Sequence, residues 1–306
     1  MEIILRMLFF YLFTFPIQSF ALLQSILTRD DSIATAVSQI ISDTSLKTTH
    51  EVCITVASSD SKAKQNNEDI LNEVLKKVTD KIFLIQMESF QLLGSVKTSR
   101  FFHIFFIDDY KSFQRIFQIM NHSVINNANF LIVHTLMNNE HAHIDMILRD
   151  FWSIFIFNVN ILHHLPDEDK ISLYTFFTFE KFYCNEIHLV LWKTFKNGKF
   201  QGVKEFYPKK MRNLFNCPVR IGSFNSPPFM VINTQSDGSF EFDGLDGNLL
   251  LMLADQMNFK INLTKLADDS LRWGTVYENG SSRGAIKMVS LYFINYNFTY
   301  LCCSNV

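Results

Sequence analysis

The sequence predicts an α/β fold, because short apolar runs alternate with amphipathic stretches from about Glu51 to Val159. A chain of 306 residues, of which 48% are hydrophobic, can bury a large core, and its length favours more than one domain. The 28 Lys and Arg residues nearly balance the 30 Asp and Glu residues. That balance gives no basic surface field for a polyanion, so we expect no nucleic-acid partner.

Five short runs are the candidate strands of this first region, since each is apolar and rich in β-branched or aromatic residues. They are Val52 to Ala57, Ile82 to Met87, Phe101 to Ile107, Phe130 to His134 and Ile154 to Val159.

Two amphipathic helices are predicted between these strands, from apolar residues that recur on one helical face. One face carries Ile70, Leu71, Val74, Leu75 and Val78, and the other Tyr110, Phe113, Ile116, Phe117 and Met120. Asn67 and Asp109 are the predicted N-caps. Asp108 beside Asp109 leaves a metal or acid–base pair open as a second interpretation, but paired acids at a helix start more often balance its dipole.

A second unit is expected to begin near Cys217, where the composition changes. Asn197, Gly198, Gly202 and the polar stretch Pro208 to Arg212 form the predicted connection. The pattern beyond it predicts a strand, a Pro-Pro turn, a second turn, a helix and a strand. Their ranges are Val219 to Phe224, Ser226 to Phe229, Asp237 to Gly238, about Asn248 to Asn258, and Phe259 to Leu263.

The N-terminus has the pattern of a secretory signal peptide, with Arg6, an apolar run from Met7 to Phe15, and then Pro16. A membrane anchor is the competing interpretation, but this run is shorter than the roughly 20 apolar residues that span a bilayer. No later run is long enough either, so we expect no transmembrane helix in the rest of the chain.

Four Asn residues begin N-x-Ser/Thr sequons, which are acceptors for N-glycosylation in the secretory pathway. They are Asn121, Asn262, Asn279 and Asn297. Five cysteines are too few for a disulfide scaffold. We expect a single bridge between Cys184 and Cys217, and a buried free thiol at Cys53.

Signatures of common enzymes are missing from the sequence. It has no G-x-S-x-G elbow, no Walker A loop and no complete G-x-G-x-x-G fingerprint, so we expect neither an enzyme nor a cofactor. His141, His143, His163 and His164 lack the Cys or acid partners of a zinc site. We therefore expect surface or capping histidines and no bound metal.

Three segments follow one another at compact spacing in the second unit. They read MRNLFNCPVRIGSFNSPPFMVIN (211–233), FEFDGLDGNLLLMLADQMNF (240–259) and RWGTVYENGSSRGAIKMV (272–289). A leading strand, a Pro-Pro-aromatic turn, a Gly-x-x-Gly helix start, an Asn-Phe helix end and a Trp-Gly turn occur in this order. The set resembles the first ligand-binding segment of arthropod ionotropic receptors, which are variant ionotropic glutamate receptors. With FWSIFIFNVNIL (151–162), the resemblance covers roughly 101–289.

The resemblance implies four parts: a signal peptide (1–20), a periplasmic-binding-protein-like amino-terminal domain (21–213), part of one lobe of a clamshell ligand-binding domain (214–289) and a divergent tail (290–306). The tail no longer resembles the family, and we expect it to come from a frameshift, intron read-through or an incomplete gene model.

The resemblance also implies a small-molecule ligand and a function. The ligand contacts implied are Phe242, Gly244, Pro228 and Phe229. The chain would be the extracellular N-terminal part of a chemosensory cation channel in the plasma membrane, which in full length assembles with related subunits. The alternative is a secreted binding module or a non-functional fragment without a channel.

Overall fold

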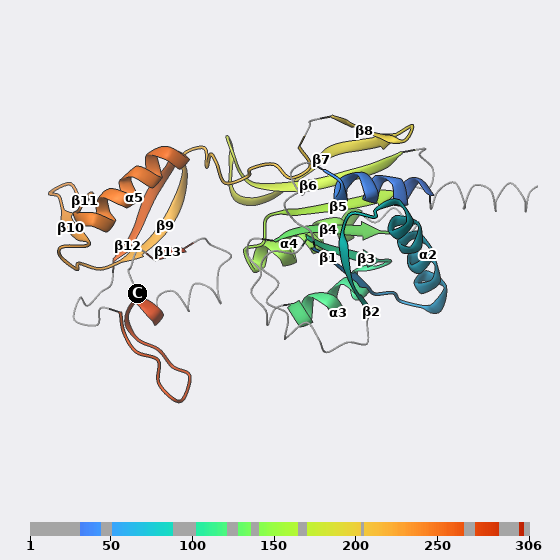
Figure 1. Cartoon of the computed structure of the whole chain (residues 1–306). Helices are drawn as coiled ribbons and strands as arrows, with labels where there is room; N and C mark the ends of the chain where they lie inside the picture. The colour runs from blue at the N-terminus through green and yellow to red at the C-terminus, as the bar shows by residue number, and fades with distance from the viewer. Residues whose placement is uncertain are drawn as a thin grey trace, which may run out of the picture. The chain divides into compact units, whose positions relative to one another are not determined.

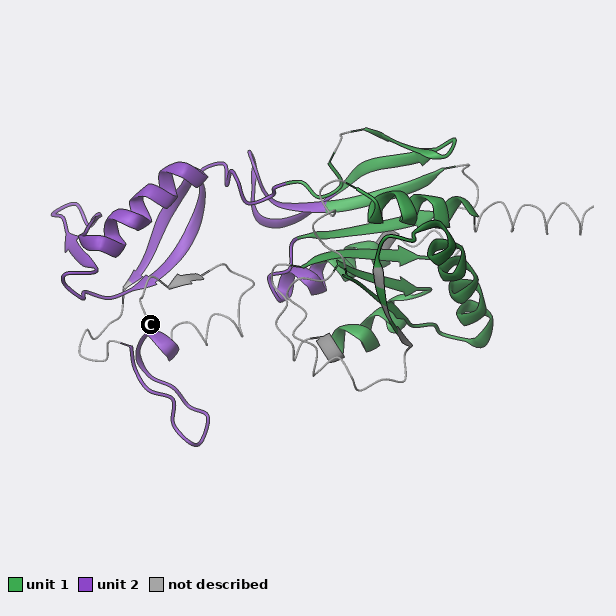
Figure 2. Ribbon diagram, viewed as in Figure 1, with its two compact units in different colours: residues 1–148, 158–175, 190–208 green, residues 149–157, 176–189, 209–306 purple. Residues whose placement is uncertain are grey.

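The structure is a computed structural model, and it describes residues 31–43, 51–87, 102–120, 128–135, 141–164, 170–202, 205–265, 273–287 and 300–302. The chain divides into two compact units, shown in Figure 2. The first unit comprises 1–148, 158–175 and 190–208, and the second comprises 149–157, 176–189 and 209–306. Residues of the two units therefore alternate along the sequence.

A mixed eight-stranded sheet is the largest element of the structure, as Figure 1 shows. Its strand order is β2-β1-β3-β4-β5-β6-β7-β8. The strands are β1 (Glu51–Val56), β2 (Ile82–Met87), β3 (Phe102–Ile107), β4 (Asn129–His134), β5 (Val159–His164), β6 (Ile171–Glu180), β7 (Tyr183–Lys196) and β8 (Lys199–Gly202). The first five run parallel, whereas β6 is antiparallel to β5, and β8 to β7. This mixed α/β arrangement is the predicted fold class, of the periplasmic-binding-protein type.

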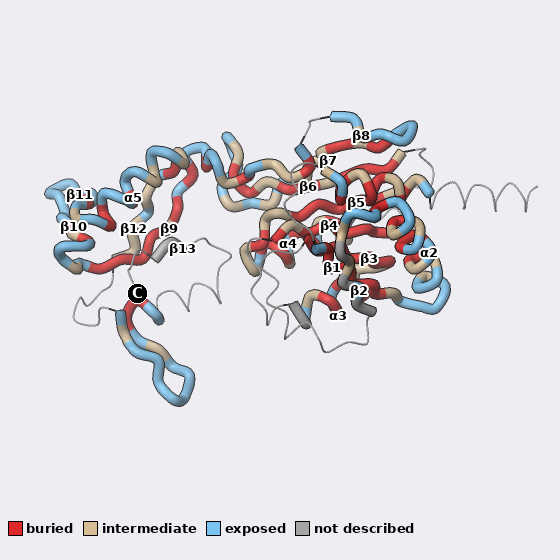
Figure 3. The backbone as a smooth tube through the Cα atoms, viewed as in Figure 1, coloured by how far each residue is buried: buried red, intermediate tan, exposed pale blue. Residues whose placement is uncertain are grey.

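The parallel strands are apolar on both faces because helices connect them and cover the sheet. Those helices are α2 (Ser61–Lys77), α3 (Tyr110–Met120) and α4 (His141–Ser153), and a further helix covers 31–41. All six residues of β3 are buried, and Figure 3 shows how much of β1, β3, β4 and β5 is enclosed. The predicted α2 face is confirmed, since Ile70, Leu71 and Val74 are buried.

Two predictions about the first unit are wrong. The run from Ile154 to Val159 is not a strand, because Phe155 takes a left-handed conformation (φ 59°) in the turn that ends α4, and β5 begins only at Val159. Asn67 is not an N-cap, since Asp60 caps α2 by accepting from the Ala63 N–H. Asn67 is instead buried inside α2.

The acid pair before α3 acts as predicted at one position and differently at the other. Asp109 accepts a hydrogen bond from the Ser112 N–H at 2.7 Å, which confirms it as the N-cap. Asp108 is buried and accepts hydrogen bonds from the N–H and hydroxyl groups of Ser59 and from the hydroxyl of Ser112. Burial opposes its ionisation, but these hydrogen bonds give Asp108 a net lowered pKa.

The predicted connection between the units begins inside the large sheet. Asn197 and Gly198, both with positive φ, form the tight turn between β7 and β8. Gly202 is the last residue of β8. The link that remains is the stretch after Gly202, which includes Pro208 to Arg212.

The second unit contains a parallel β-α-β arrangement with a hairpin inserted in it. Strands β9 (Cys217–Ser223), β12 (Phe259–Lys265) and β13 (Tyr300–Cys302) form a sheet in the order β12-β9-β13. β10 (Val231–Thr234) and β11 (Phe240–Asp243) form the hairpin, followed by helix α5 (Gly244–Met257). Among the described residues, no helix combines the length and apolar character that a membrane span requires.

Candidate ligand-binding site

The residues predicted to contact ligand meet where the β10–β11 hairpin leads into α5. Asp243, the last residue of β11, caps this helix, and its carboxylate accepts a hydrogen bond from the Gly244 N–H at 2.7 Å. The side-chain amide of Asn248 donates to the Gly244 carbonyl at 2.8 Å. The helix therefore starts four residues earlier than the sequence pattern predicted.

The Pro227–Pro228 turn lies against this helix start. The peptide bond between the two prolines is cis. The carbonyl of Pro228 accepts from the Leu245 N–H at 3.4 Å, and that of Phe229 accepts from the Asp246 N–H at 2.8 Å. With the Asp243 contact, the first three N–H groups of α5 have acceptors within the protein. In other proteins, free N–H groups at a helix start can bind an anion, but the first three N–H groups of α5 already have acceptors within the protein.

Gly244 is required by the close approach of the Pro228–Phe229 backbone. Its φ is 82°, a left-handed value that residues with a Cβ rarely adopt. A Cβ at this position would lie 2.5 Å from the Phe229 carbonyl oxygen and 2.6 Å from that of Pro228. Glycine thus lets the turn and the helix start come together, which fixes where Phe229 emerges.

Phe229 and Phe242 differ in solvent exposure, and therefore in whether a ligand could contact them. The Phe242 side chain is only 9% exposed, opposite Ile232 in the hairpin and close to Gly247 of α5. Phe229 is 44% exposed. Pro228, Phe229, Phe242 and Gly244 together form what we call the corner. Phe242 packs in its interior, and Phe229 is its exposed aromatic side chain.

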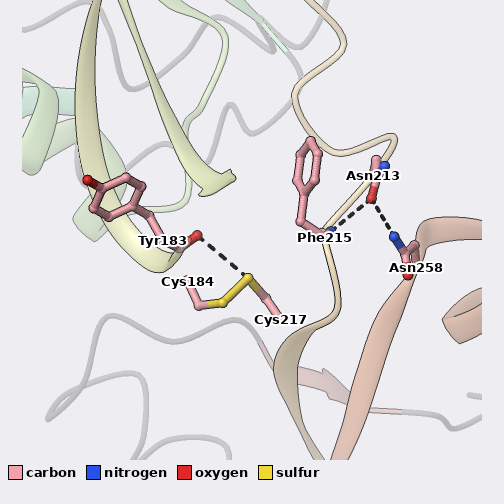
Figure 4. The surroundings of a disulfide bond; sticks show 6 residues. All are labelled: Tyr183, Cys184, Asn213, Phe215, Cys217 and Asn258. Carbon is pink, nitrogen blue, oxygen red and sulfur yellow. Dashed lines mark hydrogen bonds between the residues drawn. A yellow bond between two sulfur atoms is a disulfide. The ribbon is translucent and has the colours of Figure 1, made fainter. Parts of the chain in front are cut away.

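A disulfide bond joins Cys184 and Cys217, the pair expected from the sequence, with their Cα atoms 5.4 Å apart. Figure 4 shows it between the beginning of β7 and the beginning of β9. Both cysteines belong to the second unit. The bond ties the end of the long β6–β7 hairpin to the parallel sheet of that unit.

Cys53 is free and buried in β1, which confirms the prediction made for it. Burial raises the pKa of its thiol to about 11. The thiolate, which is the reactive form, is therefore scarce at neutral pH.

Two of the predicted glycosylation sites lie on exposed, described backbone. Asn262 is exposed on β12, and Asn279 is exposed in the loop before Gly280. The hydroxyl of Ser281 donates to the Asn279 side-chain oxygen at 2.7 Å. Asn121 and Asn297 lie outside the described residues, as does the predicted signal peptide.

The sequence analysis missed a buried histidine pair at the carboxyl ends of β4 and β5. His134 and His163 are opposite each other in the parallel register, and their Nδ1 atoms are 3.0 Å apart. His163 was expected at the surface or as a helix cap, but it is 1% exposed and lies within β5, so that expectation is wrong. In the described part of the chain, no group of three or more His, Cys, Asp or Glu residues is arranged to hold a metal. His134 is the last residue of one predicted apolar strand, and His163 lies four residues after the next. This position beside apolar strands was the sequence signal for burial.

Comparison with known proteins places the chain in a family. The family described as "Putative ionotropic receptor, ligand binding domain" matches residues 26–213, which is more than half of the chain. No curated protein matches the chain. The matched residues are those that the sequence analysis assigned to an amino-terminal domain, whereas the family description names a ligand-binding domain. The chain belongs to this family of ionotropic receptor ligand-binding domains.

Proposed function

We propose that this chain is the extracellular N-terminal part of an arthropod chemosensory ionotropic receptor, a ligand-gated cation channel of the glutamate receptor superfamily. The observation that carries the proposal is the family match over 26–213. The order of turn, hairpin, glycine-started helix and strand in the second unit adds support, because it follows the pattern of a first ligand-binding segment. In this proposal the protein recognises a small molecule and catalyses no reaction.

The domain assignment is part of the proposal. A signal peptide (1–20) precedes an amino-terminal domain (21–213), and one part of a ligand-binding lobe (214–289) follows. Residues 290–306 are the divergent tail, and of these the structure describes β13, which pairs with β9. The full receptor would sit in the plasma membrane with this region outside and would assemble with related subunits.

The proposed ligand contact is the corner formed by Pro228, Phe229, Phe242 and Gly244. Phe229 supplies an exposed aromatic surface, and the buried Phe242 and the close packing at Gly244 hold it in place. A pre-positioned aromatic ring loses little conformational entropy on binding, so it suits a recognition surface.

The test is a recording from the receptor encoded by the native transcript, expressed in oocytes and perfused with small organic acids and amines. We expect a ligand-gated cation current whose half-activating concentration rises at least about tenfold in Phe229→Ala, as for loss of an aromatic contact. Phe182→Ala is the matched control, because Phe182 is 82% exposed and lies outside the corner. A product that is recovered only from the medium and gives no current would support a secreted binding module instead.

Glycosylation of Asn262 and Asn279 belongs to the same proposal, since both lie on exposed backbone. Protein secreted from insect cells should lose the mass of one glycan in Asn262→Gln and in Asn279→Gln, measured by mass spectrometry. A glycan mass that is unchanged in both variants would show that neither site is glycosylated and would overturn this part of the proposal.

A further inference from the structure

A cavity of about 550 Å³ lies within the second unit, apart from the Phe229 corner. Its walls come from the end of β6, from the connection 209–215 and from the C-terminal end of α5. Cavities that hold small molecules measure about 300–1,000 Å³, so this volume suits a ligand of modest size.

Lys210 is a buried basic side chain in the wall of this cavity. Lys210 is only 8% exposed. Its Nζ donates a hydrogen bond to the Phe157 carbonyl at 2.6 Å. The same nitrogen lies 4.3 Å from the centre of the Phe176 ring. An ammonium group has three donors, and among the described residues Phe157 is its one hydrogen-bond acceptor. Burial therefore lowers the pKa of Lys210 well below its ordinary value, and a bound anion would favour its charged form.

Two further cations line the cavity, and they are accessible. Lys209 and Arg212 are both exposed. The one lining carboxylate, Glu180, is engaged by His188, whose Nδ1 is 2.7 Å from the Glu180 Oε2. The wall thus carries three basic side chains and a single carboxylate that already has a partner, so it favours an anion.

The remaining lining gives the cavity an apolar side. Phe177 and Phe179 extend from β6, and Phe215 projects from the connection. Phe215 is 41% exposed, which leaves much of its ring available to a ligand. Aromatic faces beside cations fit a molecule that carries both an apolar body and a negative group.

The connection that carries these groups is held at several points. The Asn213 Oδ1 accepts from the Phe215 N–H at 2.8 Å and from the Asn258 side-chain amide at 3.0 Å, as Figure 4 shows. The Leu214 N–H donates to the Met257 carbonyl at 2.8 Å. The Cys184–Cys217 disulfide follows immediately along the chain. Since binding costs less when groups are already positioned, this anchoring favours a ligand site.

We propose that this cavity binds a small organic anion with an aromatic or apolar body. The anionic group faces Lys210 and Arg212, and the body packs on Phe177 and Phe215. This site is separate from the Phe229 corner and does not depend on that corner being a ligand contact.

The experiment is isothermal titration calorimetry on the secreted chain, with 3-phenylpropanoate as the probe. 3-Phenylpropylamine, a cation of the same body, and acetate, an anion without the body, are the comparison compounds. We expect 3-phenylpropanoate to bind at least about tenfold more tightly than either, because each lacks one of the two contacts. No binding of 3-phenylpropanoate at millimolar concentration, or equal binding of the amine, overturns the proposal.

Variants place the binding in this cavity. Arg212→Gln should weaken binding of 3-phenylpropanoate at least about fivefold, and Lys210→Met more strongly, because each removes a charge-assisted contact. Arg212 is exposed, so its variant keeps the test decisive if Lys210→Met does not fold. Arg283→Gln, at an exposed position outside the cavity, should bind normally. Unchanged affinity in Arg212→Gln, or affinity lost in Phe229→Ala instead, assigns the binding elsewhere and overturns the proposal.

Discussion

His134 and His163 stand opposite each other on neighbouring parallel strands, with their Nδ1 atoms 3.0 Å apart in the interior of the first unit. Burial, together with the nearby His163 and His143, lowers the pKa of His134 to about 3, although Asp108 and Asp109 act in the opposite direction. The ordinary pKa of histidine is about 6.5. His134 therefore stays neutral in the folded protein where it would bind a proton in the unfolded chain.

This difference predicts acid destabilisation of the first unit. As pH falls from about 6.5 toward about 3, the unfolded state takes up a proton at His134 that the folded state does not, so the free energy of unfolding decreases. The contribution is fully present above about pH 6.5. Urea midpoints at about pH 7 and about pH 5 measure it, and His134→Gln should flatten the difference. An equally steep pH dependence in His134→Gln would assign the effect to other groups.

Gly244→Ala should destabilise the second unit by roughly 2 kcal/mol or more, since the new Cβ meets two backbone carbonyl oxygens and the residue has positive φ. Gly238→Ala is the matched control. Gly238 has nearly the same φ, 83° against 82°, but a Cβ added to it would meet nothing within 4 Å. We expect about 1 kcal/mol for Gly238→Ala from the backbone conformation alone. Chemical denaturation measures both, and equal losses would show that the Pro228–Phe229 approach adds nothing.

Replacing both Cys184 and Cys217 by Ser should lower the free energy of unfolding by roughly 3–4 kcal/mol. The two residues are separated by 33 positions, and a loop of this size loses about that much chain entropy in the unfolded state when it is closed. Denaturation of the oxidised protein, the reduced protein and the double variant provides the comparison. A double variant as stable as the oxidised protein would contradict this expectation.

Cys53 should be inert toward a thiol reagent such as DTNB in the folded protein. Burial keeps the thiol away from solvent, and its raised pKa, about 11, makes the reactive thiolate scarce at neutral pH. In a Cys302→Ser, Cys303→Ser background, we expect no reaction under native conditions and one thiol after unfolding without reductant. A thiol that reacts rapidly in the native protein would show that β1 opens.

The periodicity of the sequence was sufficient for four of the five parallel strands of the large sheet, β1 to β4, since buried parallel strands read as continuous apolar runs. β2 matches its predicted range in full, β3 and β4 differ by one residue at their first position, and β1 is shifted by one residue at both ends. The strand wrongly predicted at 154–159 came from the same rule, which takes a short apolar run as a buried strand. Ile154 and Phe155 are as apolar as strand residues, but they form the turn after α4, and apolar content alone does not separate these cases.

The strands β6 to β8 were missed for a different reason. β7 is largely half-exposed along its length, and its side chains alternate between exposed and partly buried in its first half. Lys193 is buried although it is charged, and its ammonium lies 4.2 Å from the centre of the Phe206 ring. A charged residue inside a strand hides the apolar pattern, because its aliphatic stem packs as an apolar group would.

At the candidate corner, the sequence identified the participating residues but not what each one does. The Gly244 requirement depends on Pro228 and Phe229, which lie 15 or more positions earlier in the chain, and such an approach leaves no local signal. The buried position of Phe242 likewise follows from the hairpin register and from Gly247. The cavity beside Lys210 draws on three distant segments, so spacing alone could not assemble it.

The interleaving of the two units along the sequence restricts how this protein could be recombined with a relative. A chimera joined after residue 213 would take Cys184 from one parent and Cys217 from the other, and would also divide Asn213 from Asn258. A parent that lacks either cysteine would leave its counterpart as an unpaired thiol. Exchange by shuffling at this junction is therefore permitted only among chains that keep the cysteine pair, so the hairpin and the strand it is bonded to must be inherited together.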